Sequence, residues 1–385
     1  NHWRADSSST LASPGNKGYA ITAQDRTLTD HLQALGVDAT VERHLTGGPR
    51  LRWGLGATAK VSLIICTRHN RKVLEPCLRA IARSTYGNFE VIVVDNGGRS
   101  PENEKWYETV GGGIDLRVLL WDKPFNYSAV NNLGACEATG DVLLFLNDDT
   151  EAVQPDWLEE MLGWIAYPGI GAVGAQMLWK NGRIQHGGDV LGMNGFADHL
   201  FTGANPDEWT MMGSPRWYRN VSAVTGACLM IRRDLFEQVG GFNEAFILCG
   251  SDVELCLKIR RAGKRIVCTP FAGVLHHERA TRAGYDDPND VFTSFWHYQS
   301  ALFGGDQYFN PNLSLFSRIP ALRHPDELRA PAIVSPVVGR PLTPTKQGAA
   351  KMEDEATILA EACQLMPSEV EATKRLHETN KAPFE

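Results

Sequence analysis

The chain has 385 residues, of which 43% are hydrophobic and 22% are charged, and its formal net charge is −7. This length allows one large domain with appendages or two domains. The negative charge, without a dense cluster of Lys and Arg, argues against general nucleic-acid binding. The sequence contains no run of about 18 apolar residues, so it predicts no membrane span. The 8 cysteines form no C-x-x-C pair and lie mostly in apolar runs, which favours buried free thiols in a reducing cytoplasm over disulfides or zinc sites.

Residues 1–58 combine a lead rich in Ser, Gly and Pro with one helical pattern at 28–36, and we predict a linker or N-terminal cap there. The lead has neither an initiating Met nor the apolar core of a signal peptide. We therefore expect an excised fragment of a longer polypeptide.

From residue 60 onward, apolar strand patterns alternate with helical patterns. We predict strands at 60–66, 89–95, 115–121 and 142–147, and helices at 71–85, 102–110 and 127–140. This alternation is typical of right-handed βαβ units, so the expected fold class is α/β, with a mainly parallel, Rossmann-like sheet and helices on both faces. In such sheets, ligands bind beyond the carboxyl ends of the strands.

Three of the predicted strands end in polar side chains, namely Thr67, Asp95 and the run Asn147-Asp148-Asp149. Asn and Asp after a strand often form only a turn. Carboxylates are also the oxygen ligands that hard divalent cations prefer. Because these strand ends converge at one edge of the sheet, a shared site explains them better than three independent turns.

The second half is expected to contain strands at 171–179, 222–233, 264–270 and 272–278, long loops at 182–217, and helices within 353–378. His276 and His277 end the last strand. Adjacent residues of a strand face opposite ways, so we expect at most one of the two to reach a given site. Imidazole combined with carboxylate suits manganese or a similar divalent ion.

The pattern at 251–263 predicts a further helix, with Ser251 as its N-cap. Asp252 lies on the apolar face of this helix. Glu254 lies on the opposite face with Lys258, where we expect solvent. An inward carboxylate at a helix start can simply stabilise the helix, or it can act as a general base on a rigid element, and the pattern leaves both roles open.

Over residues 58–315, the chain resembles family 2 glycosyltransferases, and most closely their bacterial O-antigen and rhamnosyltransferase-like branch. The resemblance rests on an ordered set of segments: VSLIICTRHN, VIVVDNGG, FNYSAVNNLGACEATGDVLLFLNDDTE, VSAVTGACLMIRR, GGFNEAF, SDVELCLKIRRAG and LHHERATR. It implies the GT-A fold, an inverting mechanism, a nucleotide-sugar donor, and Mn²⁺ or Mg²⁺ as cofactor. We accordingly expect a linker or cap at 1–58, a GT-A domain at 59–315, and a partly helical C-terminal extension at 316–385.

The resemblance also implies roles for single residues. Asp95 matches the acid that binds the nucleotide base, Asp149 the metal ligand at the donor diphosphate, and His276 the histidine near this metal. Asp252 matches the catalytic base. Further donor-binding residues are expected to be Thr67, Arg68, Asn126, Asn132, Asn147 and Asp148. The chain departs from the usual family pattern at Cys66, His69, Asn147, Ser251 and Glu254.

We therefore expect an inverting glycosyltransferase that moves a sugar from a UDP-, GDP- or dTDP-sugar to a hydroxyl of a glycan or lipid-linked glycan in bacterial surface polysaccharide synthesis. Gln185, His186 and Gly226 are expected on the acceptor side. The protein is expected in the cytoplasm or at the inner face of the plasma membrane, with further glycosyltransferase domains of the same polypeptide as partners.

Two alternatives to this function remain open. A nucleotidyltransferase should carry a Gly-rich, basic phosphate loop after its first strand, whereas the segment CTRHNRK contains no glycine. A catalytically inactive glycan-binding module should lack Asp149 or Asp252, and both are present.

Overall fold

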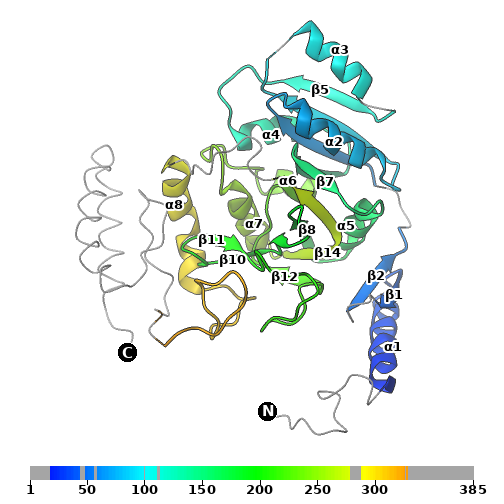
Figure 1. Cartoon of the computed structure of the whole chain (residues 1–385), viewed down its shortest axis with the longest axis vertical. Coiled ribbons are helices and arrows are strands. Elements are labelled where there is room, and N and C mark those ends of the chain that lie inside the picture. The colour runs from blue at the N-terminus through cyan, green and yellow to red at the C-terminus, as the bar shows by residue number, and fades with distance from the viewer. Residues whose placement is uncertain are drawn as a thin grey trace, which may run out of the picture. The chain divides into compact units, whose positions relative to one another are not determined.

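The computed structural model describes residues 18–43, 48–55, 59–98, 100–110, 113–277, 288–325 and 327. The chain divides into two compact units, residues 1–58 and residues 59–385. In the first unit, helix α1 (Gly18–Ala34) is followed by the antiparallel strands β1 (Ala39–Arg43) and β2 (Pro49–Trp53) (Figure 1). The helical pattern predicted at 28–36 belongs to α1. The helices predicted within 353–378 lie outside the described residues.

One half of the main sheet of the second unit is parallel, as predicted. It contains β3 (Val61–Thr67), β4 (Phe89–Asp95), β5 (Leu116–Leu120) and β6 (Val142–Asn147). The first five residues of β6 are buried because both of its neighbours and helices on both faces cover it. Three of these strands, β3, β4 and β6, end in polar residues along one edge of the sheet, as the sequence predicted.

The other half of the sheet mixes strand directions. The order along the sheet is β12-β14-β8-β13-β6-β3-β4-β5. Strand β13 (Cys228–Arg232) is antiparallel to both β6 and β8 (Ile170–Leu178), and β14 (Arg265–His276) is parallel to β8. The shorter strands are β7 (Thr150–Ala152), β9 (Ile184–His186) and β12 (Arg219–Val221) within this sheet, and β10 (Asp189–Leu191) and β11 (Ala197–His199), which pair with each other.

Two predictions for this half were wrong in detail. The strands expected at 264–270 and 272–278 form one strand, β14. Its pairing with β8 shifts register between Thr269 and Val274, which accommodates Pro270 without ending the strand. The strand expected at 222–233 begins only at Cys228, and the residues before it form a loop.

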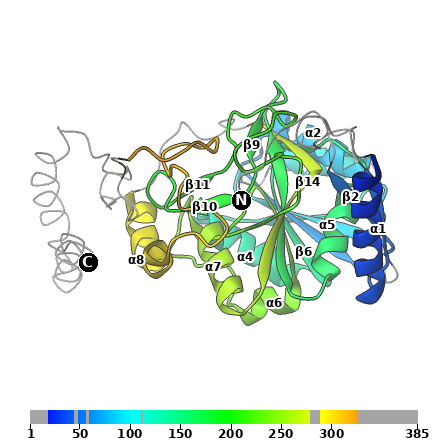
Figure 2. The same cartoon turned by 90° about the horizontal axis from the view of Figure 1, so that it is seen from below.

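Helices cover both faces of the sheet. Figure 2 shows α4 (Tyr127–Glu137) and α7 (Ser251–Arg261) on one side and α5 (Trp157–Ala166) on the other. The other helices are α2 (Arg71–Ala82), α3 (Pro101–Val110), α6 (Arg233–Gln238) and α8 (Pro288–Gly304). None of the helices within the described residues is long and apolar enough to cross a membrane.

The core joins the sheet to α4, α6 and α7. Phe145 of β6 lies 5.1 Å from Phe236 of α6 and 4.8 Å from Phe242, measured between ring centroids. Burying such side chains stabilises the fold by roughly 1.5–3 kcal/mol each. The seven cysteines within the described residues are free thiols, as predicted, but Cys136 is exposed rather than buried.

The Glu90 carboxylate, on β4, is expected to stabilise the fold at neutral pH but not in acid. Its carboxylate accepts hydrogen bonds from Ser62 Oγ at 2.6 Å and from the Thr139 amide at 2.6 Å, and Lys60 Nζ lies 3.4 Å away. Burial alone would raise the pKa of Glu90, but these hydrogen bonds and the Lys60 charge lower it from 4.5 to about 2. The ionised form therefore stabilises the fold above its unfolded pKa of about 4.3, and this contribution is lost as the pH falls towards 2.

We expect Glu90→Gln to lower the free energy of unfolding by on the order of 2 kcal/mol at pH 7. Urea denaturation of both proteins at pH 7 and at pH 3 measures this. The difference between wild type and variant should be clearly smaller at pH 3. An equal difference at both pH values would show that the carboxylate charge is not responsible.

Candidate active site

Thr67 and Asp148 meet at the carboxyl ends of β3 and β6. The parallel register pairs Cys66 with Asn147, so the residues that follow face each other, and Thr67 Oγ1 donates to Asp148 Oδ2 at 2.7 Å. Burial, with the negative charge of Asp149 adding to it, raises the pKa of Asp148 to about 6, although the Thr67 hydrogen bond acts in the opposite direction. Two of the predicted donor-binding residues are therefore in direct contact.

Asp95 ends β4 and is held by three neighbours. Its Oδ1 accepts a hydrogen bond from the Gly97 amide at 2.6 Å. Its Oδ2 accepts one from Tyr107 Oη at 2.8 Å and lies 2.9 Å from His69 Nδ1. His69, which departs from the family pattern, thus contacts the acid that the resemblance assigns to nucleotide-base binding. Both lone pairs of Oδ2 are used in this way, whereas Oδ1 can accept one further hydrogen bond.

Asp149 and His276 converge from two strands. The pairing of β7 with β14 places His276 opposite Thr150, next to Asp149, and the distance from Asp149 Oδ1 to His276 Nε2 is 3.1 Å. Asp149 is 6% exposed. The neighbouring His277 contacts Glu151 instead, with Nε2 at 2.7 Å from Oε1. Of these two histidines, only His276 brings its side chain to the Asp149 carboxylate, as the alternation of side chains along a strand requires.

The hydrogen bonds of His276 fit a metal ligand. Its Nδ1 lies 2.8 Å from Gln185 Oε1, and a carbonyl oxygen at that position requires a proton on Nδ1. The neutral ring then carries its lone pair on Nε2, which faces Asp149. Asn147 Nδ2, a hydrogen-bond donor, lies 3.4 Å from His276 Nε2. A ligating imidazole whose other nitrogen is held in this way is typical of metal sites. Asp149 and His276 therefore fit a divalent cation.

Asp252 lies in the first turn of α7. Its Oδ2 accepts a hydrogen bond from the Gly226 amide at 2.8 Å, and its Oδ1 accepts one from the Val253 amide at 2.8 Å. Burial, together with the negative charge of Asp189, raises its pKa, whereas the two amides act in the opposite direction. A Cβ at position 226 would lie 2.5 Å from Tyr127 Oη, so only glycine lets the backbone approach Asp252 in this way.

A short backbone segment connects this carboxylate with the end of β6. The Asn147 amide donates to Ala227 O at 3.1 Å. Ala227 directly follows Gly226, whose amide binds Asp252. The predicted base and the predicted metal ligands are therefore held by one rigid part of the fold.

Two predictions for α7 were wrong. The helix begins at Ser251, so its N-cap is Gly250, which has φ = 92°. Glu254 is only 4% exposed, and its carboxylate lies 3.0 Å from Lys258 Nζ rather than in solvent. The reason is α8, a helix that the sequence analysis did not predict, which packs against α7.

Helix α8 also fixes the residues that lead into α7. The buried carboxylate of Asp290 accepts hydrogen bonds from three successive backbone amides, those of Ile247, Leu248 and Cys249, at 2.5, 2.6 and 2.9 Å. The start of α7 is therefore held in place, and Asp252 with it.

Asn126 and Asn132, predicted to bind the donor, form hydrogen bonds within the protein. Asn126 caps α4 by accepting from the Ala129 amide at 2.9 Å and donates to Glu244 O at 2.8 Å. Asn132 accepts from the Phe242 amide at 3.0 Å and donates to its carbonyl at 2.9 Å. These bonds fasten α4 to the segment before α7 and give both residues a structural role. Arg68 is exposed.

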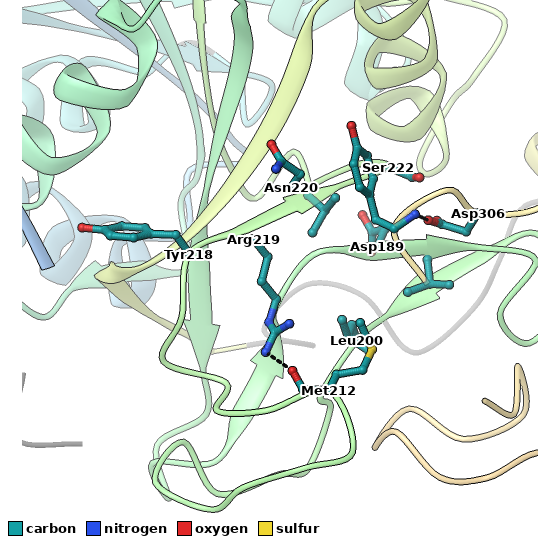
Figure 3. Close-up of a pocket in the computed structure, with 11 residues that line it drawn as sticks. Asp189, Leu200, Met212, Tyr218, Arg219, Asn220, Ser222 and Asp306 are labelled. Atoms are coloured by element: carbon teal, nitrogen blue, oxygen red, sulfur yellow. Dashed lines mark hydrogen bonds between the residues drawn. The ribbon is translucent and has the colours of Figure 1, made fainter. Parts of the chain in front are cut away.

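His186, which was predicted on the acceptor side, lies beside two polar residues that the sequence analysis missed. His186, Asp189 and His199 form a cluster in which one possible ligand atom from each side chain lies within 4.8 Å of the other two. No spacing motif revealed it, because the three residues come from three different short strands. Asp189 also lines a pocket of about 240 Å³ with Arg219, Ser222 and eight other residues (Figure 3).

Residues 62–240 match the family model for glycosyl transferase family 2. These residues form a family 2 glycosyltransferase domain. The family 2 domain and the sheet around it confirm the expected GT-A fold.

Two curated relatives match most of the chain. The chain is 38% identical over 338 residues to the O-antigen biosynthesis protein RfbC of Myxococcus xanthus, and 39% identical over 331 residues to the uncharacterized protein y4gI of Sinorhizobium fredii. These matches cover 85% and 81% of this chain, but only 26% and 36% of the relatives. The chain thus spans about a quarter to a third of their length. Among solved structures, a mannosyltransferase from Pyrobaculum calidifontis in complex with GDP-Man and Mn²⁺ has 18% identity and a TM-score of 0.47, covering 74% of each chain.

Proposed function

We propose that this chain is an inverting, metal-dependent glycosyltransferase that moves a sugar from a nucleoside-diphosphate sugar to a hydroxyl of a glycan or glycolipid. The observation that carries this proposal is the approach of Asp149 and His276 to 3.1 Å at the carboxyl edge of the sheet, with Asp252 held nearby. Family membership of residues 62–240 supports the reaction class.

On the donor side, Asp149 and His276 would hold Mn²⁺ or Mg²⁺. When bound there, such a cation neutralises negative charge on the departing diphosphate. Gln185 keeps the lone pair of His276 directed at this position through the proton on Nδ1. Asp95, Thr67 and Asp148 would bind the nucleotide.

On the acceptor side, Asp252 would act as the general base. The acceptor oxygen forms a bond to the sugar C1 while the bond from C1 to the phosphate oxygen breaks, and the bonding electrons leave with the diphosphate. The acceptor proton moves to Asp252. A carboxylate whose pKa is raised by burial is a better proton acceptor, and the amides of Gly226 and Val253 keep it oriented.

The biological setting belongs to the proposal as well. RfbC, named for O-antigen biosynthesis, matches 85% of this chain, which supports a role in bacterial surface polysaccharide synthesis. Because the relatives are much longer, we propose that the chain is one module of a larger enzyme. The free cysteines within the described residues favour a cytoplasmic location.

The test is to incubate the protein with UDP-, GDP- and dTDP-sugars and Mn²⁺ and to identify the products by ³¹P NMR. A glycosyltransferase releases the nucleoside diphosphate. A nucleotidyltransferase would instead cleave the diphosphate itself and give a nucleoside monophosphate or a sugar phosphate. An inactive glycan-binding module would leave every donor unchanged, and either of these results would contradict the proposal.

A further inference from the structure

His186, Asp189 and His199 form a compact cluster beside the acceptor side of the proposed active site. His199 Nδ1 lies 2.6 Å from Asp189 Oδ1 and 2.9 Å from His186 Nδ1, and His186 Nδ1 lies 3.4 Å from Asp189 Oδ1. The side chains of His186 and Asp189 are 0% and 3% exposed, whereas that of His199 is 40% exposed. Two imidazole nitrogens and one carboxylate oxygen thus converge on one point that can be reached from solvent.

The local backbone is built to bring these three side chains together. Asp189 and His199 are directly opposed partners of the antiparallel pair β10–β11. Gly187 and Gly188 reverse the chain between His186 and Asp189, and Gly188 has φ = 101°, a conformation that favours glycine. A Cβ at position 188 would also lie 2.4 Å from Val221 Cγ1. The geometry of the cluster is therefore set by the fold rather than by side-chain rotation.

Only one arrangement of protons on two neutral imidazoles satisfies the short contacts within this cluster. If His199 Nδ1 carries a proton for Asp189, a second proton on His186 Nδ1 points at the first across 2.9 Å. If His199 Nδ1 carries none, its lone pair faces a carboxylate oxygen at 2.6 Å. The remaining choice leaves His186 protonated on Nε2, which loses the 3.4 Å hydrogen bond from the Thr225 amide. A cation bound by all three atoms needs this same tautomer of His186, in which the lone pair of Nδ1 already points towards Asp189 and His199.

We propose that His186 Nδ1, Asp189 Oδ1 and His199 Nδ1 bind a divalent transition-metal ion, with Zn²⁺ the best match. Two imidazoles and one carboxylate, with a fourth position left open, are a common zinc ligand set. Imidazole ligands also favour zinc over Mg²⁺, which prefers oxygen.

This site is separate from the pair Asp149 and His276. Successive residues of a strand face opposite ways, and β9 contributes Gln185 to the His276 contact but His186 to the cluster. The two metals would therefore lie on opposite sides of β9. The zinc site would lie on the side of Asp252, since the Thr225 amide lies 3.4 Å from His186 Nε2 and the next amide, that of Gly226, donates to Asp252.

The experiment measures zinc bound to the full chain after chelator treatment, reloading with Zn²⁺ and removal of free metal, without nucleotide. Wild type should retain one tightly bound ion. Changes to residues around metal ligands already weaken metal binding about 10–100-fold. His199→Ala removes a ligand itself, so it should weaken zinc binding at least about 100-fold. His276→Ala, the matched control, should retain the ion.

A second measurement uses wild type alone and so does not depend on how variants fold. Co²⁺ in place of Zn²⁺ should give the visible absorption of a low-coordinate His-ligated ion. Failure of wild type to retain zinc, or retention by His199→Ala with loss in His276→Ala, would overturn the proposal.

Discussion

Asp252→Asn is expected to lower kcat by on the order of 10² to 10⁴ while leaving donor affinity unchanged. Asn has nearly the size of Asp and can still accept the hydrogen bond from the Gly226 amide at 2.8 Å, but it cannot take the acceptor proton. Donor binding should persist because we propose that it depends on Asp95, Asp149 and His276, which belong to other elements. Steady-state kinetics with a donor and acceptor, together with calorimetry of donor binding, separate the two quantities.

Asp234→Asn is the matched control for this variant. Asp234 also lies in the first turn of a helix, α6, but its side chain is 74% exposed, where it contacts Arg232 and the Leu235 amide. It follows β13, which is antiparallel to β6, and so lies at the opposite edge of the sheet. The control should keep normal turnover. Loss of donor binding in Asp252→Asn would show that α7 serves the nucleotide rather than the acceptor. Glu254 would not be a neutral control, because it is buried.

Asp149→Ala is expected to weaken the Mn²⁺-dependent binding of nucleoside diphosphate by more than about 100-fold, since it removes a metal ligand rather than a residue around one. The fold should remain intact, because Asp149 lies at the end of β6 and fills no part of the hydrophobic core. Calorimetry with UDP, GDP and dTDP, each with and without Mn²⁺, measures the effect.

Asp141→Ala serves as the control for Asp149→Ala. Asp141 is an exposed carboxylate at the amino end of the same strand, so its removal changes the net charge equally but far from the site. Binding should be unchanged in this variant. Unchanged binding in Asp149→Ala would instead contradict the metal assignment.

The parallel half of the fold could be predicted because each of its elements carries its own periodic pattern. The apolar run from Val142 to Leu146 is long enough to mark a doubly covered strand, and β3, β4 and β6 end where the apolar runs end. Parallel strands that are neighbours in a sheet end at the same edge, so Thr67 and Asp148 could be expected close together. Their contact at 2.7 Å agrees with this reasoning.

Features that depend on contacts between distant segments could not be predicted in this way. The burial of Glu254 follows from α8, whose sequence lies more than 30 residues further along the chain. The cluster of His186, Asp189 and His199 arises from the pairing of strands only three residues long, which carry no measurable period. The two strands expected at 264–270 and 272–278 are one strand, because a shift of register between Thr269 and Val274 keeps β14 continuous.

The most direct test of the account is the configuration of the glycosidic bond that the enzyme forms. With the donor identified from the nucleotide-sugar panel, the anomeric ¹H and ¹³C signals of the product show whether C1 has been inverted. A single displacement, with Asp252 as base on the acceptor side and the diphosphate leaving from the opposite face, predicts inversion. Retention of configuration would contradict it, because it requires a different arrangement at C1.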